Sequence, residues 1–202
     1  MRLIRLAFVV CACVVIAACS IGKPIPQATT YVIELPAAAP TAVRRSETLR
    51  MGNVHVAAPF AGDALVYRMD EVRYTADPYN AFIVEPAGML GSRMAQWLDR
   101  AGPFQSVVQP ESVRGAPYIL EATVSELYGD FRPGYAPAAV VTVQFALLDL
   151  TGVRSKVVLE RTIASRVNLP EASPGALVRG YGEALAEILL QLVPNLGDER
   201  VK

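Results

Sequence analysis

The chain has 202 residues, of which 52% are hydrophobic, so it is long enough to form one domain with a substantial core. Its 19 basic side chains balance 19 acidic ones, and no cluster of Lys and Arg is present that could neutralise nucleic-acid phosphates. The 3 cysteines are Cys11, Cys13 and Cys19, all near the amino terminus. A framework of disulfides through the domain is therefore excluded.

The amino terminus has the pattern of a secretory signal peptide. Arg2 and Arg5 give it a positive start, Leu6–Ile16 form an apolar run, and Ala17-Ala18 supply the small residues that a signal peptidase requires. The run is too short to cross a bilayer, which takes about 20 apolar residues. We therefore predict a signal peptide, residues 1–18, that is removed after Ala18.

Cys19 directly follows the small residues, and this arrangement resembles the bacterial lipoprotein signal. In that signal the thiol is diacylated, the chain is cut before the cysteine, and the new amino terminus receives a further fatty acid such as palmitate. Because each buried methylene contributes about 0.8 kcal/mol, two or three acyl chains hold a protein on a membrane. We predict lipid attachment at Cys19, and Ser20 after it resembles the signal for sorting to the outer membrane. The alternative is a plain secretory signal with an incidental cysteine.

Residues 19–29 are predicted to be an extended tether, because Pro24 and Pro26 oppose a helix. The domain is predicted over residues 30–193. Its first strand is expected at Thr30–Leu35, with a surface loop after it. A charged tail, residues 194–202, is expected to follow the domain.

Further segments alternate apolar and polar residues, as strands with one wet face do. Such alternation favours an antiparallel sheet covered on one side only. The segments are Leu49–Ala58, Ala64–Met69 with Val72–Tyr74 as a hairpin or a sharply bent strand, Phe104–Val108, Tyr118–Ser125, Val141–Leu147 and Lys156–Val167.

Two segments have the apolar spacing of amphipathic helices. The first is predicted over Pro86–Ala101, where Trp97 shares the apolar face, and Gly102 is expected to end it in the left-handed conformation. The second begins at Ser173, a helix-capping residue, and is ended by Pro194 and Gly197. The predicted fold is α+β: a single mostly antiparallel sheet of five or six strands, with both helices on one face.

Groups that commonly carry catalysis are missing from the sequence. The single histidine, His55, lies beside Asn53 on a strand and is expected to be solvated rather than catalytic. Glu121 and Glu126 are predicted to lie on opposite faces of one strand, so they cannot form a carboxylate pair. No phosphate-binding loop, HExxH motif or nucleophile elbow occurs. We therefore expect no enzymatic activity, no catalytic residue, no metal site and no cofactor.

The loop Gly129–Pro137 is the segment that we favour for a protein contact. It carries Phe131, Arg132 and Tyr135 between two strands, and aromatic and Arg side chains on loops are frequent interface anchors. The alternative is that the loop only connects the strands. The solvated strand face with Asn53 is the next surface to consider.

Several motifs together resemble the ABC-type transport auxiliary lipoprotein family over roughly Thr30 to Leu192. The residues that carry the resemblance are Leu65-Val66-Tyr67-Arg68, Tyr79-Asn80-Ala81-Phe82, Met89-Leu90, Gln96-Trp97-Leu98, Gly102–Val108, Tyr118-Ile119-Leu120 and Glu126–Asp130.

The resemblance implies a role beside MCE-type lipid transport systems. In these systems an ABC ATPase and a permease in the inner membrane work with a periplasmic MCE protein. The expected protein is a non-enzymatic lipoprotein of the Gram-negative envelope, on the periplasmic face and at the outer membrane. Its expected partners are the membrane, the MCE-type protein and the ABC components, with a homo-oligomer left open. The alternative is an assembly or scaffold lipoprotein without a transport partner.

Overall fold

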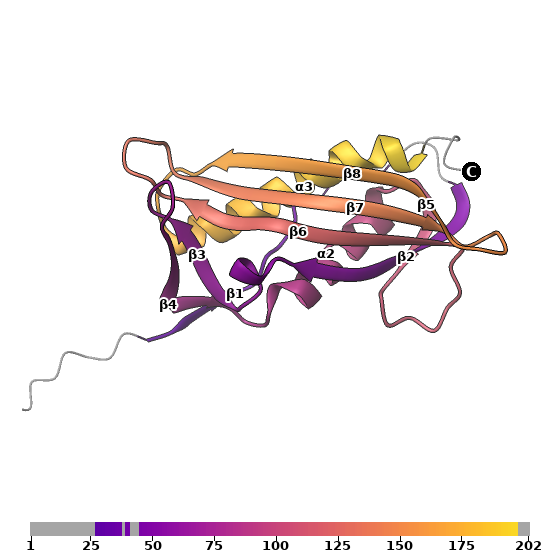
Figure 1. The fold of residues 1–202 in the computed structure, drawn as a ribbon, viewed down its shortest axis with the longest axis horizontal. Helices are drawn as coiled ribbons and strands as arrows, with labels where there is room; N and C mark the ends of the chain where they lie inside the picture. Colours follow the sequence, from indigo (N-terminus) through magenta and orange to yellow (C-terminus); the bar gives the residue numbers. More distant parts are fainter. Residues whose placement is uncertain (1–26, 38, 41–44, 198–202) are drawn as a thin grey trace, which may run out of the picture.

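The computed structural model describes residues 27–37, 39–40 and 45–197. These residues form one mixed sheet of eight strands and two α-helices (Figure 1). Cys19, most of the predicted tether and the end of the predicted tail lie outside the described residues.

The strands are β1 (Thr29–Tyr31), β2 (Arg45–Val56), β3 (Ala64–Arg68), β4 (Tyr74–Phe82), β5 (Phe104–Val108), β6 (Tyr118–Asp130), β7 (Ala138–Asp149) and β8 (Lys156–Asn168). The helices are α2 (Pro86–Ala101) and α3 (Pro174–Gly197), with a 3₁₀ turn η2 (Ala58–Phe60) after β2.

Strand β6 is the centre of the sheet. On one side it pairs with β7 along its whole length, and β7 pairs with β8, both antiparallel. On the other side its first half pairs with β2 and its last two residues pair with β3, both parallel. The sheet continues from β2 to β5 and from β3 through β4 to β1, and the β2–β5 and β4–β1 pairs are parallel.

The sheet therefore has eight strands rather than the predicted five or six, and it is mixed rather than mostly antiparallel: β3–β4, β6–β7 and β7–β8 are antiparallel, and the other four pairs are parallel. The α+β class with two helices is confirmed. Alternation shows only that a strand has one wet face, and it does not show which way the neighbouring strand runs. The parallel pairs join strands that are distant in the chain, such as Leu49 with Tyr118, so no local turn indicates them.

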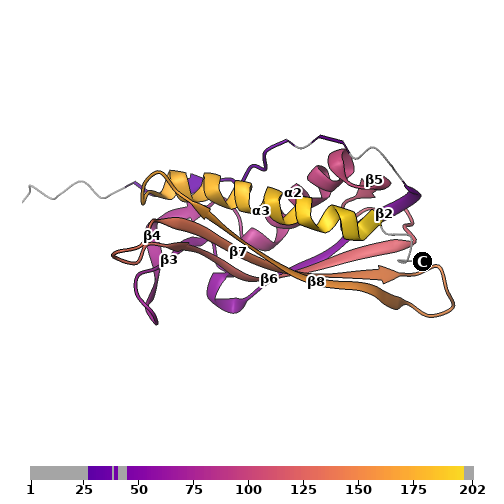
Figure 2. The ribbon, with the colours of Figure 1, turned by 90° about the horizontal axis from the view of Figure 1, so that it is seen from above.

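Both helices cover the same face of the sheet (Figure 2). Helix α2 packs on β2 and β5, and α3 packs on β7 and β8. The Ser173 hydroxyl accepts a hydrogen bond of 3.3 Å from the Ala176 N–H, which confirms the predicted cap. Helix α3 continues through Pro194, and Leu196 is fully buried, so the folded domain extends beyond the predicted boundary at residue 193.

Helix α2 ends at the predicted residue but not by the predicted geometry. Gly102 has φ −77° and ψ 170°, which is extended rather than left-handed. Glycine is required there because a Cβ atom would collide with the Leu98 carbonyl oxygen, to which the Gly102 N–H donates a bond of 2.7 Å. Trp97 is buried as predicted, and its indole N–H donates a bond of 3.0 Å to the Pro36 carbonyl oxygen.

The predicted first strand is much shorter than expected. Strand β1 ends at Tyr31, and the chain then crosses the helices as an irregular strap, residues 32–37. Ile33 in the strap is fully buried, and its N–H donates to the Met89 sulfur over 3.4 Å. A Cβ atom on Gly182 of α3 would collide with the Glu34 carbonyl oxygen, so glycine permits the close approach of strap and helix. In residues 32–35, contacts with the helices therefore take the place of the strand pairing that the β-rich sequence predicts.

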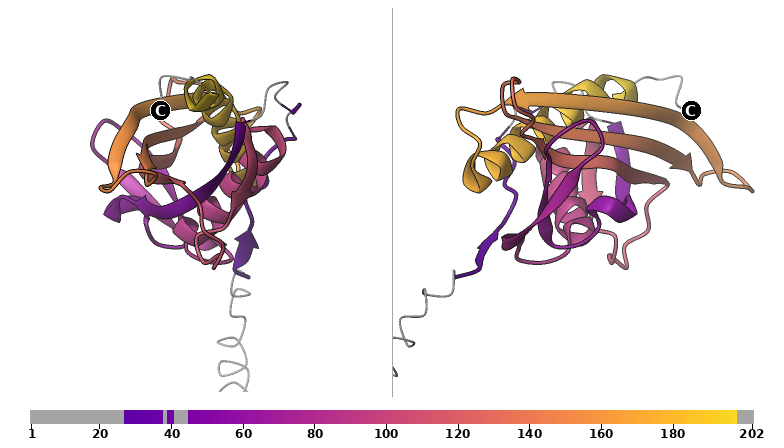
Figure 3. Two further views of the ribbon diagram at one scale, coloured as in Figure 1. Left: turned by 90° about the vertical axis from the view of Figure 1, so that its right-hand side faces the viewer. Right: turned by 60° about the vertical axis from the view of Figure 1, so that its left-hand side comes forward.

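The sheet is strongly curved (Figure 3). Its outer face carries a second, smaller apolar cluster. Val66, Tyr128 and Val140 are buried there with Phe60 of η2 against them. The Tyr128 and Tyr74 rings meet edge to face at 5.3 Å between centroids. The outer face is therefore wet only in part.

An irregularity in β6 between Val124 and Glu126 changes which side chains face outward. Glu121 pairs with Ala146 and Glu126 with Thr142, so the two glutamates share the outer face, contrary to the prediction. Four register positions still separate them, roughly 13 Å along the strand. They do not form a paired-carboxylate site.

Candidate functional site

The loop between β6 and β7, residues 131–137, is built on a tight turn. The Tyr135 N–H donates to the Arg132 carbonyl oxygen over 3.3 Å, and Gly134 between them has φ +83°. Proline followed by a glycine with positive φ is typical of a type II turn, and Pro133 fits the first of these positions. The backbone of the loop is therefore fixed by its own sequence.

Phe131 anchors the loop to the sheet. Its ring stacks on Tyr67 of β3 with 5.0 Å between centroids, and its N–H donates to the Arg68 carbonyl oxygen over 2.9 Å. The Tyr67 hydroxyl donates in turn to Asp77 over 2.6 Å. Burial, and then this bond to a carboxylate, raise the pKa of Tyr67 well above its usual range, so the phenol stays protonated.

Asp130, the last residue of β6, is buried beneath the loop. Its carboxylate accepts two side-chain bonds from Arg132, each of 2.9 Å, and one of 2.7 Å from Arg166 of β8. The pKa of Asp130 lies far below its usual range, and the bonds from Arg132 are the largest cause. Burial acts in the opposite direction, and the bond from Arg166 lowers the pKa further. Asp130 is therefore a permanent anion that fixes two arginines.

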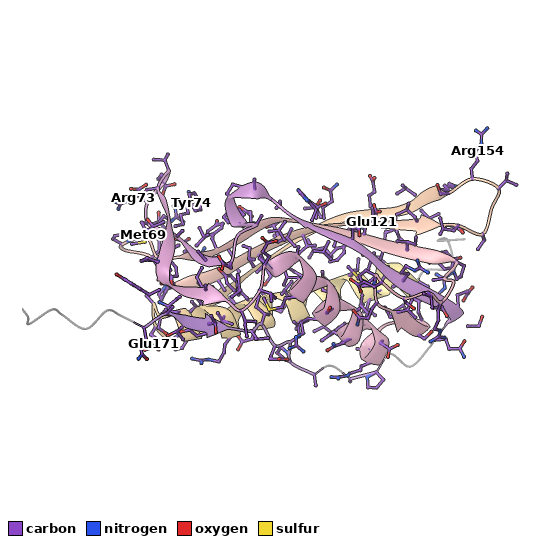
Figure 4. The ribbon with its side chains drawn as sticks, turned by 90° about the horizontal axis from the view of Figure 1, so that it is seen from below. Met69, Arg73, Tyr74, Glu121, Arg154 and Glu171 are labelled. Atoms are coloured by element: carbon purple, nitrogen blue, oxygen red, sulfur yellow. The ribbon has the colours of Figure 1, made fainter. Side chains whose placement is uncertain are left out.

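The Asp130 carboxylate belongs to a chain of charges that reaches the β3–β4 hairpin. Arg132 Nη1 lies 2.6 Å from a Glu71 carboxylate oxygen, and Arg68 lies 3.1 Å from the other oxygen. This chain joins the loop to the hairpin tip that carries Met69 and Arg73 in Figure 4. Loop and hairpin are therefore held as one unit.

The three residues predicted for a protein contact are brought together, but they are not equally available. Phe131 is half-buried. The Arg132 side chain is only 15% exposed, and its guanidinium forms ion pairs with Asp130 and Glu71. Tyr135 is 59% exposed, and the Arg132 guanidinium lies over its ring at 4.4 Å from the centroid. The surface that the loop offers is thus the Tyr135 ring with the edge of Arg132.

Other predicted residues lie as expected. His55 and Asn53 are exposed on β2. Sequence reasoning did not single out Asp130 and Arg166. The sequence predicts a strand only to Ser125 and places Asp130 in the loop Gly129–Pro137, whereas β6 continues to Asp130. Only the register of β7 with β8 brings Arg166 beside it.

The hollows in the described part of the chain are small or open. A cleft of about 80 Å³ lies between the strap and α2, lined by Arg93, Trp97 and Arg100. A groove of about 260 Å³ lies where Gly88 and Gly91 face Asn53. Small-molecule sites usually have roughly 300–1,000 Å³, so neither has the size of a typical ligand pocket. A third hollow, of about 340 Å³ along residues 157–160 of β8, is open to solvent rather than enclosed.

Over residues 27–197, outside the gaps at 38 and 41–44, no three His, Cys, Asp or Glu side chains are grouped to hold a metal ion. Over that same range, no helix combines the length and the apolar character that crossing a membrane requires.

The fold has relatives among solved structures. The crystal structure of protein XCC0632 from Xanthomonas campestris matches with a TM-score of 0.70 at 18% identity, over 82% of this chain and 92% of that one. An uncharacterized protein matches with a TM-score of 0.59 at 18% identity, over 85% and 97%. At these identities the likeness defines the fold alone. No curated protein matches the sequence significantly.

The family model of the ABC-type transport auxiliary lipoprotein component matches residues 31–193. This range covers most of the chain and nearly all of the described domain, so the chain belongs to that family and the predicted resemblance is confirmed. The protein is an auxiliary lipoprotein component of ABC-type transport, a class that implies a lipid-anchored place in the cell envelope and transporter partners.

Proposed function

We propose that this protein is a non-enzymatic auxiliary component of an MCE-type lipid transport system in the Gram-negative envelope. It is held by lipid on Cys19 at the periplasmic face of the outer membrane. There it contacts the periplasmic MCE-type protein, and through it the ABC permease and ATPase. The observation that carries this proposal is the family match, which begins at residue 31. Only a short segment separates this residue from Cys19, the cysteine of the lipoprotein-like signal.

The small hollows support a coupling role rather than a carrier role. A lipid carrier needs an enclosed apolar space, and the cleft beneath the strap is only about 80 Å³. The protein offers instead a rigid outer surface, whose most pre-ordered loop is residues 131–137. We infer that Tyr135 and Arg132 of this loop contact the transport partner. Aromatic and Arg side chains that are already held in place lose little freedom on binding.

The anchoring is tested by mass spectrometry of the membrane fraction. We expect an acylated amino-terminal peptide that begins at Cys19, and a Cys19→Ser protein with the same fold but without membrane attachment. A wild-type protein that is soluble and unmodified would contradict the anchoring.

The partner contact is tested by cross-linking and recovery of the MCE-type protein with the full-length lipoprotein. Tyr135→Ala should reduce recovery several-fold while the thermal melt stays unchanged, because the ring is exposed. Leu190→Ala is the matched control, since Leu190 on α3 is 54% exposed against 59% for Tyr135. Equal recovery with both variants would exclude the loop. No recovery of any transport component with the wild type would favour a scaffold lipoprotein.

A further inference from the structure

Four exposed apolar side chains lie at the corner of the sheet where the described chain begins. They are Val32, Tyr79, Ile83 and Val84, and the two most open are Ile83 at 60% and Val84 at 54% exposed. We call this group the corner patch. Strands β1 and β4 form the corner, at the end of the molecule opposite the β7–β8 hairpin (Figure 1).

The strand register places part of the patch on one face. Tyr31 pairs with Phe82 in the parallel β1–β4 ladder, and the Ile83 N–H donates to the Tyr31 carbonyl oxygen over 3.0 Å. Phe82 and Ile33 point into the core and are buried. Because side chains alternate along extended chain, Ile83 and Val32 point to the opposite side, away from the core.

We propose that the corner patch contacts the surface of the phospholipid bilayer. This proposal rests on the anchoring of Cys19 proposed above. Thr29, the first residue of β1, comes ten positions after Cys19, and an extended chain spans at most about 3.6 Å per residue. The tether can therefore place the corner no further than about 35 Å from the lipid-modified residue.

The chemistry of the corner patch suits an interface of lipid and water. Aliphatic side chains gain from leaving water, and a tyrosine ring combines an apolar body with a polar hydroxyl. An anchored domain meets the membrane at a high effective concentration, so a patch too small to bind alone is sufficient when tethered. Glu85 follows the patch and is exposed, which favours neutral over anionic headgroups.

This contact would orient the domain. The corner patch would face the bilayer, and the β7–β8 hairpin that carries Arg154 would point away from it (Figure 4). The proposal thus adds a second, non-covalent membrane contact to the lipid anchor.

The cysteine content of the chain permits a direct test. The three natural cysteines are removed with the signal peptide or acylated in the proposed mature protein, so one added cysteine can be labelled selectively. Val84→Cys reports on the patch, and Val153→Cys on the distant hairpin is the matched control, since Val153 is also exposed. Each purified lipoprotein is labelled with an environment-sensitive fluorophore and reconstituted into vesicles of phosphatidylcholine and phosphatidylethanolamine. A fraction of the phosphatidylcholine carries a nitroxide near the headgroup.

We expect several-fold stronger quenching at position 84 than at position 153, with a blue shift at position 84 alone. Equal or absent quenching at position 84 in protein that floats with the vesicles would overturn the corner patch and leave the anchoring intact. Protein that does not float would contradict the anchoring, and with it the corner-patch contact, which depends on the tether. Ile83→Asp combined with Val84→Cys should abolish the excess quenching, whereas Leu190→Asp combined with Val84→Cys should not.

Discussion

The two loops at the ends of β7 connect similar long strands but are held in different ways. The β6–β7 loop follows Asp130, which is buried between Arg132 and Arg166, and its Phe131 stacks on another strand. The β7–β8 loop follows Asp149, whose carboxylate accepts two bonds of 2.7 Å from Thr151, two residues further on. At the start of this loop the Leu150 N–H donates to the Pro117 carbonyl oxygen over 2.8 Å, a backbone bond to a distant segment.

The difference shows how a loop becomes a pre-ordered surface. A bond between neighbours in the chain forms a turn but leaves it free to move as a unit, whereas contacts to distant strands fix its position in the fold. Val153 in the β7–β8 loop is fully exposed, while Phe131 of the β6–β7 loop is half-buried.

Trp97→Ala should lower the free energy of unfolding by about 3 to 5 kcal/mol, as truncations of buried aromatic residues do. Trp97 is 5% exposed, and its removal also leaves the Pro36 carbonyl oxygen without its indole donor. Chemical denaturation followed by circular dichroism measures the change. A variant as stable as the wild type would show that the strap and α2 do not pack as described.

Asp130→Asn should lower the free energy of unfolding by about 2 kcal/mol at neutral pH. Removing one partner of a buried ion pair costs about 3–5 kcal/mol, and the effect is reduced here because the Arg166 side chain is 42% exposed. The same denaturation experiment measures it.

The pH dependence identifies the charge as the cause. The folded-state pKa of Asp130 is depressed below the unfolded value of about 3.9, so its contribution is complete above that pH and is lost as the pH falls through the lower folded pKa. The stability difference between wild type and Asp130→Asn should stay constant from about pH 5 upward and shrink below about pH 4. A difference that does not change down to pH 2 would mean that shape, not charge, is responsible.

Phe131→Ala should lower the free energy of unfolding by about 1 to 2 kcal/mol, less than for a fully buried ring, because the side chain is half-buried but stacked on Tyr67. Denaturation of the variant beside Tyr135→Ala separates the inner and outer aromatic residues of the loop. Tyr135→Ala should change stability by less than about 0.5 kcal/mol, as exposed substitutions do. An equally large loss in both variants would contradict the division of the loop into an anchor and an open surface.

The sequence predicted the periodic part of this molecule well. Helix α2 has the predicted bounds, Pro86–Ala101, and β8 lies within a residue of its predicted range. The spacing of apolar residues is a local property of the chain, which is why the sequence predicts the bounds of both elements. The β-rich Thr30–Leu35 segment was predicted as one strand, but packing on α2 and α3 ends the ladder at Tyr31.

The candidate site was predicted only in outline. Loop composition indicated Phe131, Arg132 and Tyr135, and their turn follows from Pro133 and Gly134. Which of them stays open depends on partners distant in the chain, namely Tyr67 of β3, Glu71 of the β3–β4 turn and Arg166 of β8. These contacts arise from strand register, for which a single sequence has no local signal.

Asp149→Asn is expected to have the smallest effect, a loss of about 0.5 kcal/mol, and it is the matched counterpart of Asp130→Asn at the end of the next strand. Bonds from the Thr151 hydroxyl and then from its N–H lower the pKa of Asp149, but an asparagine oxygen can still accept both. Denaturation of the two variants under one condition gives the ratio of their effects. A loss at Asp149 as large as at Asp130 would mean that a local turn fixes the chain as firmly as contacts to distant strands do. The β6–β7 loop would then no longer be the more pre-ordered of the two loops, and the β7–β8 loop would be an equal candidate for the partner contact.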